Sequence, residues 1–214
     1  TETSDGGILW NNGAGFEPIG YDGPQFSGIF NGNEHTISNL YIYRPSDLTL
    51  AAVGIFGSVN NSIIQNVGVL DQNIHGNYQV GGLIGNGYYS LITNNYTTGH
   101  TTGRKEVGGL IGYSSHGITT FNFTTGNTQS HGTGVYGLST GGLIGSDYNS
   151  LTTNNYTTGN TISIAPYTGG LIGQARRGNI LNNYSTGNVT GTERVGGLIG
   201  TVFLSWPEPG STIK

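Results

Sequence analysis

Side chains that could perform acid–base chemistry or hold a metal ion are few and scattered in this sequence. It has 11 Asp and Glu residues and 5 His residues among 214 positions. Only Glu106 and Glu193 recur at one position of two repeats, in turns, whereas glycoside hydrolysis needs two carboxyl groups flanking one bond. The histidines lack the spacing of zinc ligands, and Glu34-His35 is the only adjacent acid–histidine pair. We therefore expect no enzymatic activity, no metal and no cofactor.

Asparagine forms a more regular pattern. The sequence contains six Asn-x-Ser/Thr sequons, which are acceptors of N-linked glycans in secreted proteins. They begin at Asn60, Asn95, Asn122, Asn155, Asn183 and Asn188. The four sequons from Asn95 to Asn183 occupy the same position of consecutive repeats, which predicts a row of partly glycosylated sites. The alternative is that the repeat only duplicates its own residues, since glycans about 4.8 Å apart would crowd one another.

These asparagines belong to an internal repeat that extends along most of the chain. The pentapeptide GGLIG begins at Gly81, Gly108, Gly141, Gly169 and Gly196, with spacings of 27, 33, 28 and 27 residues. Degenerate copies begin at Val53 and Ser27. A second motif stays in phase with the first, in the forms ITNNYTTG, TFNFTTG, TTNNYTTG and ILNNYSTG, at residues 92–99, 120–126, 152–159 and 180–187. Two motifs in constant phase predict a stack of repeated structural units.

The composition of each repeat predicts short β-strands joined by tight turns. Each repeat is rich in β-branched and aromatic residues and is interrupted by Gly and Asn, with no sustained helical periodicity. One repeat of about 27 residues then corresponds to one coil, and the chain to a right-handed parallel β-solenoid of about seven coils. We expect an N-terminal strand or cap at 1–25, solenoid repeats at 26–200 and a C-terminal strand or tail at 201–214. The extra residues of the 33-residue repeat, at 130–139, are expected to form a loop.

Strand alternation assigns the side chains of the second motif to two faces. The more apolar set contains Ile92 and is placed inside, where asparagines and aromatic rings would stack from coil to coil. The predicted internal asparagine ladder consists of Asn39, Asn66, Asn94, Asn154 and Asn182, and the predicted aromatic ladder of Tyr41, Tyr96, Phe123, Tyr156 and Tyr184. The other set would form an outward Thr/Asn face of Thr93, Asn95, Thr97, Thr120, Asn122, Thr124, Thr153, Asn155 and Thr157. Within GGLIG, Leu and Ile are adjacent, so one of the two is expected to form an exposed apolar row.

At these two motifs the sequence resembles the GLUG-motif repeat family. The similarity rests on GGLIG followed by NNYTTG, and on FSGIFNGNEHTISNLYI and VGIFG, which resemble the repeats that precede such arrays. It covers residues 26–200. The resemblance implies an extracellular surface protein of bacteria or archaea, such as an adhesin or the non-catalytic repeat region of a surface protease. This chain differs from the usual pattern in its high outward content of Thr and Asn, and it has no recognisable catalytic partner domain.

The charge balance excludes several classes of partner. Charged residues make up 8% of the sequence and the net charge is −4, with 7 scattered basic residues, so a nucleic-acid-binding stripe is not expected. No apolar run approaches the length of a transmembrane helix. The chain has no Cys and no Met and begins at Thr1. We interpret it as a secreted, mature segment that has lost its signal peptide, or else as a shortened chain.

Three functions remain open on the sequence alone. The first is structural: a secreted subunit or module of an extracellular fibre, a surface layer or an adhesin stalk. Its coils would associate end to end, or stack on the rest of a larger surface protein, through Ile8, Leu9, Trp10, Val202, Phe203, Leu204 and Trp206. The second is ice binding by the flat Thr/Asn face. The third is carbohydrate binding by exposed tyrosines, drawn from Tyr88, Tyr89, Tyr113 and Tyr148.

Overall fold

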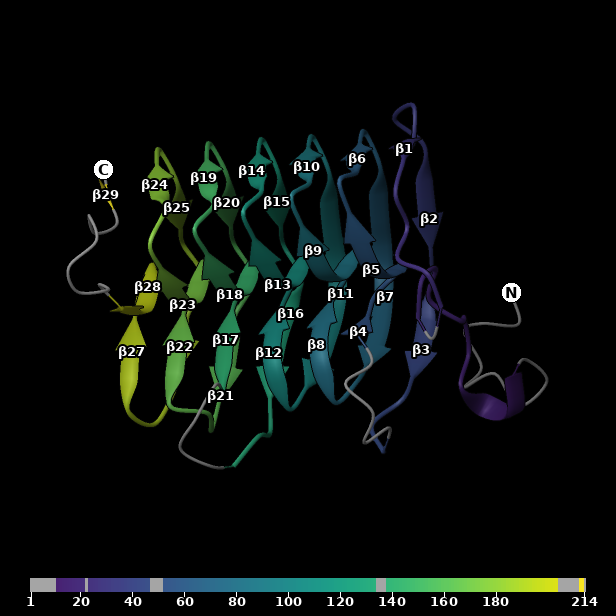
Figure 1. The fold of residues 1–214 in the computed structure, drawn as a ribbon. Coiled ribbons are helices and arrows are strands. Elements are labelled where there is room, and N and C mark those ends of the chain that lie inside the picture. Colours follow the sequence, from purple (N-terminus) through teal and green to yellow (C-terminus); the bar gives the residue numbers. More distant parts are fainter. Residues whose placement is uncertain (1–10, 22, 47–51, 134–137, 204–211, 214) are drawn as a thin grey trace.

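The computed structural model describes residues 11–21, 23–46, 52–133, 138–203 and 212–213 of the chain. These residues form a parallel β-solenoid of about six turns, preceded by the short 3-10 helix η1 (Asn11–Gly13). The strands stack side by side along the solenoid, with the first and last coils at opposite ends (Figure 1). The predicted all-β solenoid class is therefore confirmed, with about six turns in place of seven.

Four parallel sheets run along the solenoid, and each coil passes through them in the order C, A, D and B. Sheet C contains β1 (Ile29–Asn31), β6 (Ile63–Gln65), β10 (Leu91–Thr93), β14 (Ile118–Thr120), β19 (Leu151–Thr153), β24 (Asn179–Leu181) and β29 (Thr212–Ile213). Sheet A contains β2 (Thr36–Ser38), β3 (Tyr41–Tyr43), β7 (Gly68–His75), β11 (Tyr96–Gly103), β15 (Phe123–Thr124), β16 (Asn127–Ser130), β20 (Tyr156–Thr157), β21 (Thr161–Ser163), β25 (Tyr184–Ser185) and β26 (Val189–Thr190). Sheet D contains β4 (Ala52–Val53), β8 (Tyr78–Gly81), β12 (Lys105–Gly108), β17 (Ser139–Gly141), β22 (Tyr167–Gly169) and β27 (Arg194–Gly196). Sheet B contains β5 (Phe56–Asn60), β9 (Ile84–Tyr88), β13 (Ile111–Ser115), β18 (Ile144–Tyr148), β23 (Ile172–Arg176) and β28 (Ile199–Phe203).

Neighbouring strands pair one repeat apart, and most pairs keep one register along their length; the register shifts by one residue within the β7–β11 pair, between Thr97 and Gly99. Leu91 of β10 is opposite Ile118 of β14, and Ile118 is opposite Leu151 of β19. The motif spacing of the sequence is therefore the length of the coil. The extra residues of the longer coil lie between β16 and β17, where the loop is predicted; residues 134–137 of that segment lie outside the described part of the chain.

The corner between sheets C and A contains a left-handed residue in each coil, and this residue overturns the predicted assignment of faces. Asn94 has a φ of 54°, and Phe121 occupies the same corner one coil later with a φ of 56°. Asparagine adopts this conformation more readily than most residues. Because the corner residue interrupts strand alternation, Ile92 before it and Asn95 after it both point inward. Four members of the predicted internal ladder instead form an outer corner row and are exposed or partly exposed: Asn66, Asn94, Asn154 and Asn182. The fifth, Asn39, is also exposed but lies between β2 and β3 of sheet A, outside this row.

The asparagines that follow the corner form the internal ladder. Asn95, Asn122 and Asn155 are fully buried. The Oδ1 of Asn122 accepts the backbone N–H and the side-chain amide of Asn95, at 2.9 and 3.1 Å. The Asn122 amide in turn donates to the carbonyl oxygens of Ile92 and Thr120, both at 2.9 Å. The donors and the acceptor of each interior amide are thus satisfied, as buried polar groups require.

Threonines two residues further along connect this motif to GGLIG across the interior. The hydroxyl groups of Thr97, Thr124 and Thr157 donate to the carbonyl oxygens of Gly109, Gly142 and Gly170, at 2.9, 2.8 and 2.7 Å. Each of these is the second glycine of its motif. At Gly109 a Cβ would overlap the carbonyl oxygen of Gly142 in the next coil, so this position has no room for a side chain. The two motifs recur in phase because they contact each other in each of these three coils.

Both apolar residues of GGLIG face the interior, so the exposed Leu or Ile row predicted at this motif is wrong. Leu110 and Ile111 are almost fully buried, as are the equivalent pairs of the neighbouring inner coils. The chain bends at this point between sheets D and B. The backbone N–H groups of both residues donate to one carbonyl oxygen, that of Leu143 in the next coil, each at 3.0 Å. Strand alternation restarts after the bend, and adjacent residues can therefore point the same way.

The aromatic ladder exists, but it lies on the outer surface of sheet A. Tyr96, Phe123, Tyr156 and Tyr184 stack ring on ring, with centroid distances of 4.8, 4.9 and 5.1 Å and interplanar angles of 1°, 3° and 4°. Tyr41 is not a member, because it is opposite Asn73 in another row. The rings lie outside because the residues on either side of them in sequence, such as Asn95 and Thr97, point inward.

Among the described residues, one carboxyl side chain is buried in the interior. Asp147 of β18 is 3% exposed, and the hydroxyl of Thr152 donates to its Oδ2 at 2.8 Å. Burial raises the pKa of this carboxyl, while the hydroxyl groups of Thr152, Ser150 and Ser114 act in the opposite direction. The equivalent positions of the neighbouring coils hold Ser114 and Ala175, which carry no charge. The fold therefore favours the neutral form of Asp147.

Replacing Asn122 by Asp should destabilise the solenoid by roughly 3–5 kcal/mol, the usual cost of an uncompensated buried charge. The carboxylate would face the carbonyl oxygens of Ile92 and Thr120, to which the amide now donates. Chemical denaturation followed by circular dichroism measures the free energy of unfolding. The matched control is Asn94→Asp at the outer corner, which should cost less than about 1 kcal/mol. Equal destabilisation by the two variants would contradict the assignment of faces.

Asp147→Asn should stabilise the protein at neutral pH and not at acidic pH. Because the carboxyl pKa is raised above its ordinary 3.8, the folded protein binds the proton more tightly than the unfolded chain does. The free energy of unfolding therefore falls as the pH rises through and above that value. An asparagine side chain does not titrate, so the variant should not show this decrease in stability. Thermal unfolding at about pH 7 should show a gain of roughly 1–3 kcal/mol, the range for an unsatisfied buried polar group. The gain should vanish at about pH 3; a gain of the same size at both pH values would assign the effect to packing.

Candidate functional site

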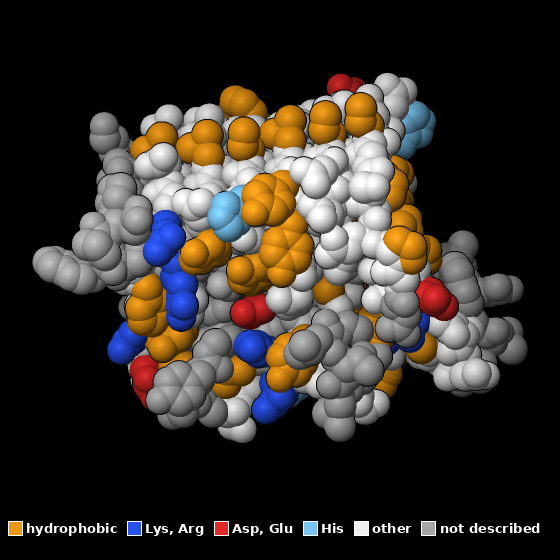
Figure 2. Space-filling view, in the orientation of Figure 1, with side chains coloured by type: hydrophobic (Ala, Val, Ile, Leu, Met, Phe, Trp, Pro, Cys, Tyr) orange, Lys and Arg blue, Asp and Glu red, His pale blue; other side chains and the backbone are white. Residues whose placement is uncertain are grey.

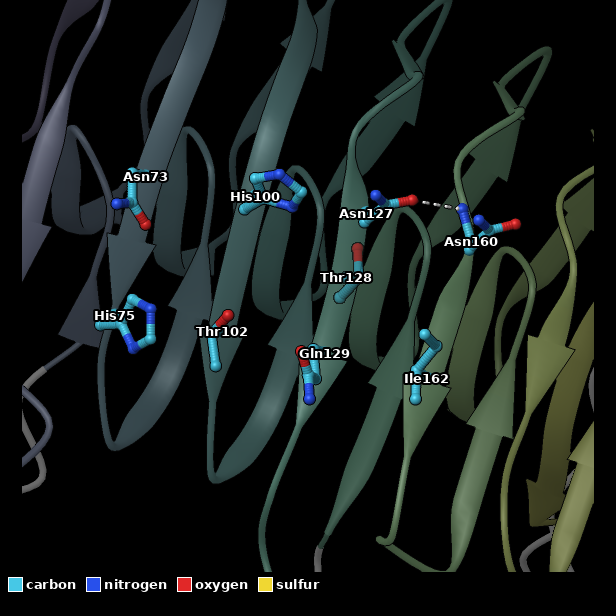
Figure 3. Close-up of a pocket in the computed structure, with 9 residues that line it drawn as sticks. All are labelled: Asn73, His75, His100, Thr102, Asn127, Thr128, Gln129, Asn160 and Ile162. Carbon is cyan, nitrogen blue, oxygen red and sulfur yellow. Dashed lines mark hydrogen bonds between the residues drawn. The ribbon is translucent and has the colours of Figure 1, made fainter.

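Buried side chains of the described coils pack between the four sheets, and the two concavities described below open on outer surfaces of the solenoid. One concavity, of about 500 Å³, lies on sheet A and is lined by Asn73, His75, His100, Thr102, Asn127, Thr128, Gln129, Asn160 and Ile162. Figure 3 shows these side chains in rows on neighbouring strands, with Asn127 directed toward Asn160. The backbone N–H of Asn160 donates to Asn127 Oδ1 at 3.0 Å, and that of Asn188 donates to Asn160 Oδ1 at 3.1 Å. The amides of this surface therefore join one coil to the next.

A second surface, over sheets D and B, gathers most of the basic side chains. We name it the aromatic–basic face and define it by Tyr78, Tyr88, Lys105, Glu106, Tyr113, Tyr148, Tyr167, Arg176, Arg177, Arg194 and Phe203. It holds four of the 7 Lys and Arg residues of the sequence, namely Lys105, Arg176, Arg177 and Arg194. Figure 2 shows Lys and Arg side chains gathered among hydrophobic ones, a class that includes Tyr, over these two sheets.

The strand register explains how this face is assembled. In sheet B, Tyr88, Ser115, Tyr148, Arg176 and Phe203 occupy one row on successive strands. In sheet D, Tyr78 is opposite Lys105, and Tyr167 is opposite Arg194. Residues far apart in the sequence thus become neighbours because their coils stack.

Each cation of the face lies over an aromatic ring. Lys105 Nζ is 5.0 Å from the ring centroid of Tyr78, and the Arg194 guanidinium is 5.2 Å from that of Tyr167. Arg176 lies 4.8 Å from the ring of Phe203. Arg177 lies 5.8 Å from the ring of Tyr148. Such contacts orient a cation without neutralising its charge.

Between sheets D and B the face is hollowed around Glu106. This concavity of about 310 Å³ is lined by Tyr78, Gln79, Asn86, Tyr88, Lys105 and Glu106. Gln79 Nε2 donates to Glu106 Oε2 at 3.0 Å. Burial raises the pKa of Glu106, and the Gln79 hydrogen bond, Lys105 and Arg176 act against it. Asn86 Oδ1 is buried and has no hydrogen-bond partner. The hollow therefore offers acceptor oxygens beside cationic and aromatic groups.

The structure brings together three of the tyrosines that the sequence suggests for carbohydrate binding. Tyr88, Tyr113 and Tyr148 lie on successive strands of sheet B, and the rings of Tyr88 and Tyr113 are 5.8 Å apart. Tyr89 occupies the adjacent corner, is exposed, and stacks on His116 at 5.0 Å. Sequence analysis missed the basic members of the face. Their distance from GGLIG could have placed them on this face, because Lys105 and Arg194 precede a GGLIG motif by three and two residues, respectively.

The outward Thr/Asn face predicted for ice binding does not exist as a face. Six of its nine residues are buried, namely Asn95, Thr97, Asn122, Thr124, Asn155 and Thr157. The other three, Thr93, Thr120 and Thr153, are partly exposed on sheet C. The left-handed corner at Asn94 is the reason, because it turns every later residue of the motif to the opposite side.

Because the inward and outward faces of the motif are exchanged, most of the predicted outward row of glycosylation sites lies inside the solenoid. Asn95, Asn122 and Asn155 are in the interior, and Asn183 is partly buried in the last coil. Their amides donate to backbone carbonyl oxygens, as Asn183 does to those of Thr152 and Leu181, both at 2.9 Å. Asn60 is partly exposed, and Asn188 is exposed. Three members of the predicted outward row are thus inaccessible in the folded protein.

An exposed apolar row does occur, on sheet C. It consists of Ile29, Ile63, Leu91, Ile118 and Leu151, which are opposite one another on successive strands. Ile29 is 70% exposed and Ile118 is 43% exposed, and the other three members are partly exposed. Figure 2 shows a line of hydrophobic side chains along the corresponding edge of the molecule.

The remaining candidate residues lie apart. Ile8, Leu9, Trp10, Leu204 and Trp206 are outside the described residues. Val202 packs against the core, and Phe203 belongs to the aromatic–basic face. Glu106 and Glu193 are separated by two strands of sheet D, so they do not form a carboxyl pair.

The described residues lack two features that would indicate a metal centre or a membrane span. Among them, no group of three or more His, Cys, Asp or Glu side chains could hold a metal ion. Within the same part of the chain, no helix has the length and apolar character needed to cross a membrane.

Comparison with known proteins shows a similarity over part of the chain. No family model matches the chain, and no solved structure matches it. A stretch of 77 residues, 36% of this chain, is 44% identical to part of Halomucin from Haloquadratum walsbyi (strain DSM 16790 / HBSQ001). That stretch spans only about 1% of the length of Halomucin. The resemblance to GLUG-motif repeats stays a prediction.

Proposed function

We propose that this chain is a non-enzymatic structural module of an extracellular or cell-surface protein, which stacks end to end on further solenoid coils. The observation that carries this proposal is the last described coil, where no further described strand pairs with four of its strands and core positions are partly exposed. Strands β25, β26, β27 and β28 each pair on one side only among the described residues. Edges of this kind template the addition of another strand.

Exposure of core positions supports stacking at this end. Val195 is 43% exposed, whereas Val107 at the same position of an inner coil is fully buried. Leu198 and Ile199 are partly exposed, although the Leu and Ile of the inner GGLIG motifs are fully buried. Burying such side chains against another coil would be favourable, since removal of apolar surface from water stabilises an association.

The opposite end is covered by aromatic side chains. Phe26 and Phe30 pack on Phe56, with ring centroids 5.1 and 5.3 Å away. Phe16 and Tyr21 also pack against the core. The two ends therefore differ, which supports addition of coils at the C-terminal end in preference to symmetric pairing of both ends.

The similarity to Halomucin is compatible with an extracellular structural role. The small share of Halomucin that the match covers supports a repeat module within a larger protein.

The placement of the two carboxyl groups with raised pKa values supports a non-catalytic role. Asp147 faces the interior, whereas Glu106 lines an outer concavity, so they do not act on one bond.

Stacking through the last coil predicts self-association of the isolated chain. Sedimentation velocity should show species larger than a monomer that increase with protein concentration, and Val195→Lys should abolish them by placing a charge on the open end. The matched control is Ile118→Lys, because Ile118 is equally exposed, at 43%, but lies on the outer face of sheet C. A chain that stays monomeric up to its solubility limit would contradict association at this end.

The burial of the sequon row predicts where N-linked glycans are absent. Asn95, Asn122 and Asn155 should carry no glycan in protein from the native host, because their amides are inside and hydrogen-bonded to the backbone. Any N-linked glycan should map to the exposed Asn188 or to the partly exposed Asn60. Glycopeptide mass spectrometry provides the measurement. Recovery of glycosylated Asn122 from folded, soluble protein would refute the interior placement.

A further inference from the structure

We propose that the aromatic–basic face binds an acidic glycan chain, whose sugars carry carboxylate or sulfate groups. This activity goes beyond the structural role proposed above and uses a different surface from the end-to-end contact. The inference rests on the charge, the aromatic rings and the unpaired acceptors of one face.

The charge of this face contrasts with that of the whole chain. The sequence has a net charge of −4 and only 7 basic residues, yet four of them share this face. Arg176 and Arg194 are both exposed. A guanidinium group forms paired hydrogen bonds with the two oxygens of a carboxylate or sulfate, so these side chains can recognise acidic sugars by geometry as well as by charge.

The tyrosines supply contacts that suit sugar rings. Tyr88, Tyr113 and Tyr148 lie on three successive strands and follow the solenoid axis. A tyrosine combines an apolar ring, against which the C–H groups of a sugar can pack, with a hydroxyl that hydrogen-bonds at its tip. Tyr88 and Tyr148 share one row, and Tyr113 lies two residues to the side of it on the strand between them. Because the three side chains belong to stacked coils, they can contact an extended polymer over several sugar units.

Two buried acceptors beside the face, one of which lines its hollow, complement the hydroxyl groups of sugars. Asn86 Oδ1 and Gln174 Oε1 are buried without a hydrogen-bond partner, and both side chains belong to a single row of sheet B. An unsatisfied buried acceptor is costly, and a ligand hydroxyl would remove that cost. A sugar chain brings many hydroxyl donors to such a surface.

Glu106 distinguishes a glycan from a nucleic acid as the ligand. Its carboxyl group lies in the hollow beside Lys105 and Asn86, where it can accept hydrogen bonds from sugar hydroxyls. The closely spaced phosphates of DNA would be repelled there, and four cations do not make the continuous basic track that a phosphate backbone needs. The observations therefore favour an acidic glycan of moderate charge density.

The test uses the full chain and four polymers: chondroitin sulfate, polygalacturonate, neutral dextran and duplex DNA. Isothermal titration calorimetry at about 0.15 M ionic strength, where distant charges are screened, should detect binding of chondroitin sulfate or polygalacturonate and none of dextran. Arg176→Gln and Arg194→Gln should each weaken that binding about tenfold, the effect of losing one charge-assisted pair. Tyr148→Ala should also weaken it, with circular dichroism confirming that each variant is folded.

Two controls separate recognition from general attraction. Arg104→Gln removes the same charge from an exposed arginine outside the face and should leave binding unchanged. Arg176→Lys keeps the charge but loses the planar group, so it should bind more weakly than the unmodified chain. The proposal is overturned if neither acidic glycan binds, if DNA binds as tightly as they do, or if Arg104→Gln weakens binding as much as Arg176→Gln. These readouts do not depend on self-association, which Val195→Lys tests separately.

Discussion

The ladder of buried asparagine amides is the interaction on which the rest of the solenoid depends. Every coil turns sharply from sheet C to sheet A, and a turn leaves backbone groups that must find partners. Asn95, Asn122 and Asn155 provide those partners from inside, each bonded to the backbone and to the next amide. Phe121 shows that the outer corner residue can change while Asn122 behind it keeps its hydrogen bonds.

The narrow cross-section follows from the second interior contact. The hydroxyl of Thr124 reaches Gly142 directly across the interior, and the glycine leaves room for the carbonyl oxygen of the neighbouring coil. With little space inside, the inward positions accept few residue types, which explains why the two motifs repeat. Interior positions outside the two motifs do vary, as Ser114, Asp147 and Ala175 show, but these side chains are buried. The groups that a ligand could contact are therefore those of the outer surfaces.

The aromatic–basic face illustrates how this variation becomes function. Arg176 occupies the outward position that Tyr148 holds one coil earlier, and Arg194 the one that Tyr167 holds. The interior of these coils is unaffected by such exchanges, because the side chains project away from it. A solenoid can thus acquire a binding surface along its length while its C-terminal end remains free to contact further coils.

The sequence alone determined the strand content, the coil length and the parallel stacking, because the spacing of GGLIG is the spacing of paired strands. It did not determine which side chains face inward. Alternation assumes an unbroken strand, whereas the left-handed Asn94 and the bend at Gly109 each reset it, so Asn95 and both apolar residues of GGLIG are inside. The clustering of Lys105, Arg176 and Arg194 was likewise decided by tertiary structure, since residues in separate coils become neighbours only when the coils stack.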